Sequence, residues 1–230
     1  MKKTFAIAAA AAVVALGQLA MAGAAQAQST PEFAFNAGVT SDYVFRGFSQ
    51  TNEDPAVFGG VDATVGSFYA GAWASNVDFG DSTDAEVDVY GGYRTEAAGF
   101  AFDVGVVGYL YVDAPDGVDY DYLEVKLAAS RAIGPYTIGA AAYISPDFFG
   151  LDEEAVYGEV NAAYVADNGV SVSGAVGFQS LDVNEDYTTW NVGLGLPLVA
   201  GIGLDIRYHD TDYDGTLSEG RGVATLKYAF

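Results

Sequence analysis

The chain has 230 residues, of which 51% are hydrophobic and 17% charged, and its formal net charge is −22 at pH 7. So large an acidic excess excludes general nucleic-acid binding, because nothing would neutralise a run of phosphates. The absence of cysteine and the single histidine exclude disulfide scaffolds, zinc–thiolate sites, iron–sulfur clusters and cysteine nucleophiles, and they leave little basis for a histidine metal site.

Residues 1–27 have the pattern of a Sec-type secretory signal peptide. Lys2 and Lys3 form a basic start, an apolar Ala-rich stretch follows at 5–22, and Ala25-Gln26-Ala27 has the small-x-small pattern of a cleavage site. We therefore expect cleavage after Ala27. A retained membrane anchor is the alternative, which the well-formed cleavage site and the polar continuation disfavour. Residues 28–230 would then be the mature protein, the outer-membrane part of the chain that follows the signal peptide.

The mature part shows apolar residues at every second position rather than a helical period. Phe100, Phe102, Val104 and Val106 alternate with small or polar residues, and the segments at 123–129 and 202–208 repeat the pattern. Alternate side chains of a strand face opposite sides, so each segment would have one apolar and one polar face. No apolar run here is long enough for a transmembrane helix.

The alternation predicts about twelve strands, most of them about 9–12 residues long, which is the length that a tilted strand needs to cross a bilayer. They lie at 33–47, 56–65, 68–76, 85–95, 100–111, 120–131, 136–144, 155–166, 170–179, 187–196, 202–210 and 222–230. Short connections alternate with longer ones, as in outer-membrane barrels. The predicted fold class is all-β: a transmembrane, antiparallel, up-and-down β-barrel in the outer membrane.

Acidic residues gather in the longer connections, for example at Asp152-Glu153-Glu154, whereas the short turns carry only Glu96 and Asp167. In an even-stranded barrel both termini are periplasmic, so the acidic loops should lie outside, facing lipopolysaccharide and divalent cations. Solubility of exposed loops is the simpler explanation and accounts for part of the pattern.

The C-terminal strand predicts how the protein is assembled. Ala224, Leu226, Tyr228 and Phe230 alternate up to the last residue. A final strand that ends in an aromatic residue resembles the assembly signal of bacterial outer-membrane barrels. We expect Phe230 and Tyr228 to be recognised by the barrel assembly machinery, with outer-membrane lipid and lipopolysaccharide as further partners and oligomerisation left open.

Four segments resemble the TorF-like family of small outer-membrane porins. The segment at 39–51 reads VTSDYVFRGFSQT, and its continuation includes PAVFGG at 55–60, YAGAWASNV at 69–77 and EVDVYGGY at 86–93. The resemblance spans the mature chain and is sharpest in its first third. It implies passive transport, a function that is itself only inferred for the family, and it supplies no catalytic residues.

The polar face of the strands predicts the lining of a pore. The charged candidates are Arg46, Glu86, Asp88, Arg94, Glu124, Lys126, Glu159, Asp205, Arg207 and Lys227. A barrel of twelve strands is wider than one of eight, whose side chains can fill the interior, so small solutes or ions could diffuse through it. Acids exceed bases on the whole polar face, which favours cations. Pairing of these charges across the lumen would instead give a closed structural or interaction barrel.

Two weaker patterns are set aside. Asp210-Thr211-Asp212-Tyr213-Asp214-Gly215 opens like an EF-hand loop, but Arg221 stands where that loop needs a glutamate. His209 lies near acids and serines, yet nothing beside it has the pattern of a nucleophile with its base. We therefore predict no enzyme activity, no metal site and no cofactor.

Overall fold

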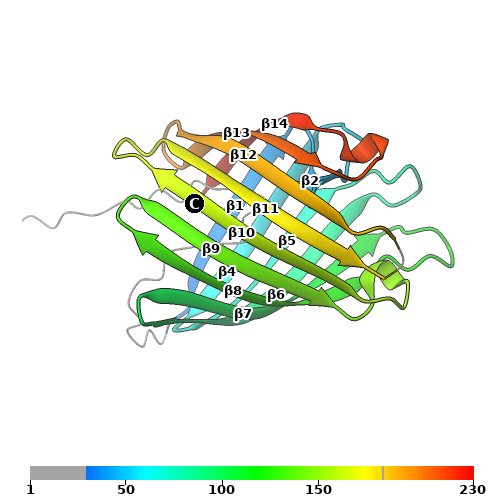
Figure 1. Cartoon of the computed structure of the whole chain (residues 1–230), viewed down its shortest axis with the longest axis horizontal. Helices are drawn as coiled ribbons and strands as arrows, with labels where there is room; N and C mark the ends of the chain where they lie inside the picture. The colour runs from blue at the N-terminus through cyan, green and yellow to red at the C-terminus, as the bar shows by residue number, and fades with distance from the viewer. Residues whose placement is uncertain (1–29, 183) are drawn as a thin grey trace, which may run out of the picture.

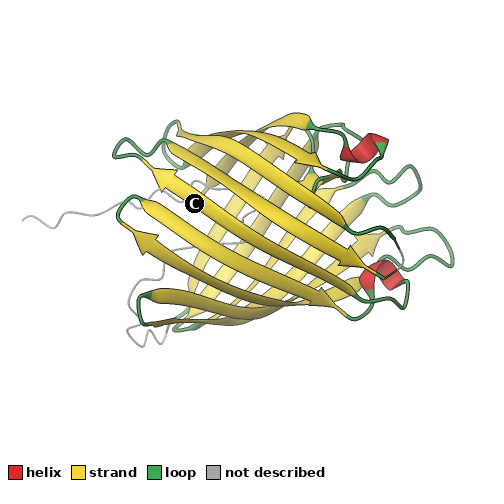
Figure 2. Cartoon of the chain, in the orientation of Figure 1, coloured by secondary structure: helices red, strands yellow, loops and turns green. Residues whose placement is uncertain are grey.

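Twelve strands form a closed barrel in the computed structural model, which describes residues 30–182 and 184–230 (Figures 1 and 2). The wall strands are β1 (Glu32–Thr40), β4 (Ala56–Val65), β5 (Phe68–Asn76), β6 (Ala85–Ala97), β7 (Phe100–Val112), β8 (Tyr122–Ile133), β9 (Tyr136–Ser145), β10 (Ala155–Val165), β11 (Ser171–Leu181), β12 (Tyr187–Pro197), β13 (Ile202–Thr211) and β14 (Arg221–Ala229). The predicted signal peptide lies outside the described residues.

Each wall strand pairs antiparallel with its neighbours along the chain, and β14 returns to pair with β1. The C-terminal residue completes this seam, because Phe230 and Phe35 exchange two backbone hydrogen bonds of 2.8 and 3.0 Å. Their rings also stack, with centroids 5.6 Å apart. The closed ring leaves no unpaired strand edge, which confirms the predicted up-and-down barrel.

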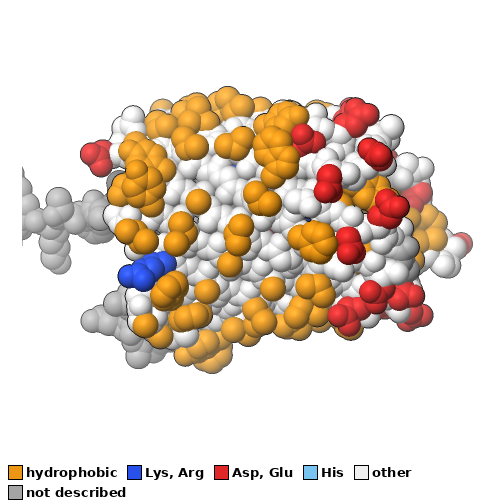
Figure 3. Space-filling view, viewed as in Figure 1, with side chains coloured by type: hydrophobic (Ala, Val, Ile, Leu, Met, Phe, Trp, Pro, Cys, Tyr) orange, Lys and Arg blue, Asp and Glu red, His pale blue; other side chains and the backbone are white. Residues whose placement is uncertain are grey.

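The outer surface of the wall is apolar and the inner surface polar, as the alternation predicts. Val125 is 38% exposed on the outside, whereas the next residue, Lys126, is 7% exposed and points inward. Apolar side chains cover the middle of the barrel in Figure 3, and acidic ones gather at one end. Among the described residues, no helix is long and apolar enough to cross a membrane.

The two ends of the barrel differ. Long connections, at 41–55, 77–84, 113–121, 146–154, 182–186 and 212–220, share the end that we call the loop end. The opposite end, which we call the turn end, has short connections such as Gly66-Ser67 and also holds the first and last residues of the barrel. The two short 3-10 turns, Phe148–Gly150 and Thr216–Ser218, lie in loop-end connections.

The predicted strand at 33–47 is wrong in its second half, from residue 41 onward. The wall strand β1 ends at Thr40, and residues 41–55 leave the wall as one connection that contains a small hairpin, β2 (Val44–Phe45) and β3 (Phe48–Ser49). Alternating aromatic residues, Tyr43 and Phe45, continue the strand pattern into this connection. They face other parts of the interior instead of lying on the wall, so the pattern alone could not reveal the end of the strand.

Candidate functional site

The hairpin of residues 41–55 folds back into the barrel. Val44 pairs with Ser49 and Phe45 with Phe48, which leaves Arg46 and Gly47 as a two-residue turn. Both have positive φ, 46° and 92°, as tight hairpin turns require. Glycine adopts this conformation freely, whereas arginine does so at a cost of about 1–2 kcal/mol. The contacts of the Arg46 side chain must offset that cost.

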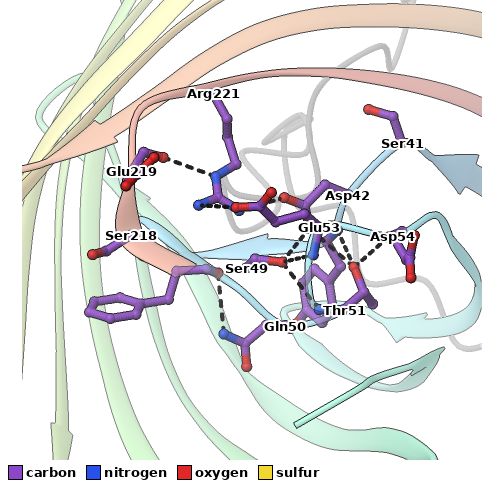
Figure 4. Close-up of polar contacts among 12 residues, drawn as sticks. Ser41, Asp42, Ser49, Gln50, Thr51, Glu53, Asp54, Ser218, Glu219 and Arg221 are labelled. Atoms are coloured by element: carbon purple, nitrogen blue, oxygen red, sulfur yellow. Dashed lines mark hydrogen bonds and ion pairs between the residues drawn. The ribbon is translucent and has the colours of Figure 1, made fainter. Parts of the chain in front are cut away.

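Asp42 holds the base of the hairpin at the loop end (Figure 4). Its carboxylate accepts hydrogen bonds from the hydroxyls of Ser49 (2.6 Å) and Thr51 (3.1 Å). Arg221, the first residue of β14, forms ion pairs with Asp42 at 3.0 Å and Glu53 at 3.3 Å. These contacts fasten both arms of the hairpin to the seam of the barrel.

Arg46, at the tip, contacts the opposite wall. Its two terminal nitrogens donate to the two carboxylate oxygens of Glu124 at 2.8 and 2.7 Å, and one also donates to Gln179 Oε1 at 3.1 Å. The ring order places β9 six strands from β1 in either direction, so β9 is opposite β1. The strands β8 and β11, which carry Glu124 and Gln179, are close to β9 in the ring and therefore belong to the far side. The hairpin therefore crosses the lumen, and the paired side chains are only 6% and 1% exposed.

Aromatic rings surround the Arg46 guanidinium. Its central carbon lies 4.4 Å from the ring centroid of Tyr157, 5.1 Å from that of Tyr143 and 4.6 Å from that of Phe45. Tyr109 donates its hydroxyl to Glu124 at 3.0 Å. Such distances permit cation–π attraction, so carboxylate, amide and ring faces together compensate for burial of the charge.

A second aromatic group fills the lumen at the loop end. Stacked Tyr109 and Tyr122, with centroids 4.3 Å apart, pack with Tyr111 against rings from four connections. Those rings are Phe45 of the hairpin, Phe79 and Tyr120, and the consecutive residues Phe148 and Phe149. The loop half of the barrel is thus packed like a protein core.

A cavity of about 240 Å³ lies under the hairpin. Its lining includes hairpin residues Tyr43 to Gly47 together with wall residues from several sides of the barrel. The charged wall residues in it are Asp88, Lys126, Glu159 and Lys227, and His209 also contributes. It is therefore a chamber with charged and polar residues in its walls, and the hairpin covers it on one side.

The predicted pore-lining residues all lie on the inner side. Arg46 is on the hairpin rather than on the wall; the others are Glu86, Asp88 and Arg94 on β6, Glu124 and Lys126 on β8, Glu159 on β10, Asp205 and Arg207 on β13, and Lys227 on β14. The structure places them inside the barrel, and their contribution to an ion path stays a prediction.

Six of these residues take part in ion pairs. Besides Arg46–Glu124, Arg207 pairs with Asp205 at 3.1 Å. Arg94 and Lys126 share Asp103, at 3.2 and 3.0 Å. Asp103 also accepts the Tyr69 hydroxyl at 2.7 Å. Most cationic charge on the inner wall is therefore neutralised locally.

Three acids and one base remain without an ion pair within the part of the chain that the structure describes. Glu86 accepts a hydrogen bond from Tyr43, and Glu159 accepts from Tyr157 and Asn161. Asp88 has one buried carboxylate oxygen that no described residue contacts by a hydrogen bond. Lys227, the base, lines the same cavity as Asp88 and Glu159. The residues of the predicted set that have no ion pair are thus mostly acids.

The hairpin site contains residues that the sequence analysis missed. Gln179, Tyr143 and Tyr157 complete the surroundings of Arg46. Their positions on the inner face follow from strand parity, so that signal was available. Tyr157 also needs Gly177 on β11, because a side chain there would collide with the tyrosine hydroxyl.

Asp210 and His209 belong to the two weaker sequence patterns, and their contacts in the barrel are structural. Asp210 Oδ1 accepts a hydrogen bond from its neighbour Thr211, and Asp212 caps the amide of Thr188 at 2.6 Å. No group of three potential ligands arranged for a metal ion occurs within residues 30–182 and 184–230. His209 is 7% exposed and lines the cavity from β13.

The barrel is similar to solved outer-membrane channels. It superimposes on the COG4313 outer membrane channel from Pseudomonas putida F1 with a TM-score of 0.53 and 10% identity, covering 92% of this chain and 99% of that one. The KdgM porin gives a TM-score of 0.59 at 8% identity, and the NanC porin 0.56 at 11%; each covers 86% of this chain and 99% of its own. At these identities the likeness shows the fold.

No curated protein sequence shows significant similarity to the chain. A family model does match, over residues 24–229, and it therefore includes the hairpin, the whole wall except the last residue of the seam, and the cavity. Because the match spans nearly the entire chain, the protein belongs to the family described as "Bacterial protein of unknown function (Gcw_chp)".

Proposed function

We propose that the protein is an outer-membrane channel for passive diffusion of small solutes or ions, with a preference for cations. The observation that carries the proposal is the closed barrel with an apolar outside and a polar, partly hollow lumen. The resemblance to TorF-like porins and the channel-like fold support it. The cation preference is supported by Glu86, Asp88 and Glu159, since charged groups near a narrow path select ions of opposite sign.

A closed barrel that acts through its acidic loops is the second candidate. It is supported by the hairpin that crosses the lumen and by the aromatic group at the loop end. In that case the protein would have a structural or binding role at the cell surface. The two candidates differ in one measurable property, which is conduction.

Conductance in planar bilayers tests the proposal. Refolded protein should give discrete current steps, and a salt gradient should give a reversal potential on the cation side. Absence of steps from protein that is demonstrably folded in the bilayer would favour the closed barrel. A reversal potential on the anion side would reject the cation preference while leaving the channel intact.

The proposed location is the outer membrane, reached by Sec export, removal of residues 1–27 and insertion by the barrel assembly machinery. The loop end would face outward, toward lipopolysaccharide. An epitope inserted at Asp152, in a loop-end connection, should then be accessible to antibody on intact cells, whereas one at Asn168, in a turn, should not. The reverse pattern would contradict this orientation.

Removal of Phe230 tests the assembly proposal. The residue closes the seam through backbone and ring contacts with Phe35, so its loss should lower the amount of barrel in the outer-membrane fraction. Phe33→Ala, which removes another exposed aromatic ring of β1, is the control. Equal insertion of both variants would argue against a special role for the terminal aromatic residue.

A further inference from the structure

The surroundings of Arg46 have the properties of a guanidinium receptor. Glu124 binds two nitrogens through two oxygens, and Gln179 supplies a further acceptor. This fork geometry matches a planar guanidinium, whereas an ammonium group has a single nitrogen and cannot supply two parallel N–H···O bonds from two nitrogens. The receptor groups Glu124, Gln179, Tyr143 and Tyr157 all belong to the wall strands β8 to β11.

Only the tip of the hairpin enters this receptor. The other polar anchors, Asp42 with Ser49 and Thr51 and the ion pair to Arg221, lie at its base. Arg46 also adopts a left-handed backbone conformation, at a cost that the contacts of its side chain help to offset. Arg46 is thus the polar side chain by which the hairpin enters the wall site, whereas Tyr43 and Phe45 contact other parts of the wall.

The cavity leads directly to the receptor. Arg46, Tyr143 and Tyr157 line it, whereas Glu124 is shielded behind Arg46 and is 1% exposed. Removal of the Arg46 side chain would therefore open the Glu124 carboxylate to the cavity. A small solute in the lumen could then reach the same bonds that Arg46 now makes.

We propose that β8 to β11 form a binding site for small guanidinium-bearing solutes, and that Arg46 occupies it as a tethered competitor. A free guanidinium compound must displace a competitor held at high effective concentration, so its apparent affinity is reduced by the fraction of time that the site is vacant. Displacement would release the tip of the hairpin from the far wall. That such release widens an ion path rests on the proposed channel function.

Binding of methylguanidinium to the full barrel in detergent tests the site by calorimetry. Arg46→Ala should bind it with a half-saturating concentration at least about tenfold lower than the wild type, since the competitor is gone. Methylammonium should bind much more weakly to the same variant. Adding Glu124→Gln to Arg46→Ala should abolish the gain, because a neutral amide replaces the carboxylate.

Lys227→Ala is the matched control, because it removes one positive charge from the same cavity but vacates no carboxylate. It should bind methylguanidinium no more tightly than the wild type. An equal gain in Lys227→Ala and Arg46→Ala would mean that lost repulsion, rather than a specific site, is responsible. Equal affinity of the wild type and Arg46→Ala would overturn the competitor role.

Two further measurements keep the test decisive. If Arg46→Ala does not fold, the wild type still provides a test of the site. Weak methylguanidinium binding by the wild type should disappear in Glu124→Gln. Persistence of that binding in Glu124→Gln would overturn the site. Conductance is recorded separately. Binding without any current would reject the channel while leaving the site, whereas current without guanidinium binding would reject the site while leaving the channel.

Discussion

The loop half and the turn half of the lumen are built in opposite ways. In the loop half, a hairpin and a group of aromatic side chains pack against the wall, and Arg46 contacts strands far from its own. In the turn half, ion pairs such as Arg94–Asp103 and Lys126–Asp103 join neighbouring strands of the wall. The wall therefore determines the shape of one half, whereas the hairpin and other loop-end connections determine that of the other.

This difference indicates where movement could change permeability. The residues of the turn-half pairs are placed by strand register, because Arg94 lies directly opposite Asp103 in the β6–β7 ladder. Their backbone positions change only if the wall opens. Near its base the hairpin is held by backbone hydrogen bonds, from Ser41 to Ala224 and from Asp78 to Gln50. Its tip is held by side chains, so the tip can leave the lumen without breaking the ladders of the wall.

The largest effect is expected from removing the hairpin. Tyr43 and Gln50 are joined by a 2.7 Å backbone hydrogen bond, so two glycines can replace residues 44–49. Single-channel conductance should rise severalfold, because the obstruction across the lumen is gone. A matched shortening of the exposed connection at 115–118 should leave the conductance unchanged. Equal conductance of the hairpin variant and the parent would show that the constriction lies elsewhere.

The wall of the barrel could be predicted from the sequence, and the hairpin could not. Strands such as β4 and β5 have the predicted bounds, because a wall between two different environments imposes strict alternation along each strand. The same parity places Glu124 and Lys126 on one face. The contact between Arg46 and Glu124 joins residues 78 positions apart. It depends on a chain reversal that alternation does not encode.

A second prediction tests the wall itself. Val125 faces outward and Lys126 inward, so Val125→Arg would place a charge against lipid. The free energy of unfolding should fall by about 2–4 kcal/mol if Val125 lies near the bilayer midplane. Urea titration of protein folded into lipid vesicles measures it. Val125→Ala, which stays apolar, should lose far less; equal losses would mean that the outer face does not meet lipid.

The turn half can be probed through the charge of Asp103. Asp103→Asn removes the one carboxylate that Arg94 and Lys126 share. Both cations then lose this carboxylate, and Lys126 already lines the cavity. The reversal potential under a salt gradient should move clearly toward the anion limit. Asp116→Asn, on an exposed connection, controls for loss of an acid anywhere in the protein.

The smallest shift is expected for Lys126→Gln, which alters the same cluster in the opposite sense. Arg94 and Tyr69 still hold Asp103 after the substitution, so the cluster becomes neutral, whereas the parent cluster has two cations for one carboxylate. The reversal potential should therefore move toward the cation limit. This shift should be smaller than the opposite shift of Asp103→Asn, because Asp103→Asn also frees Lys126 to extend into the cavity.

Folding should be nearly unaffected by Lys126→Gln, since the new side chain is polar and can still donate a hydrogen bond toward Asp103. Its reversal potential also separates the two halves of the lumen. If the hairpin half controls selectivity alone, neither substitution at the Asp103 cluster will change the potential. If the turn half contributes, the two variants will shift it in opposite directions, and shifts of the same sign would exclude Asp103 and Lys126 from the ion path.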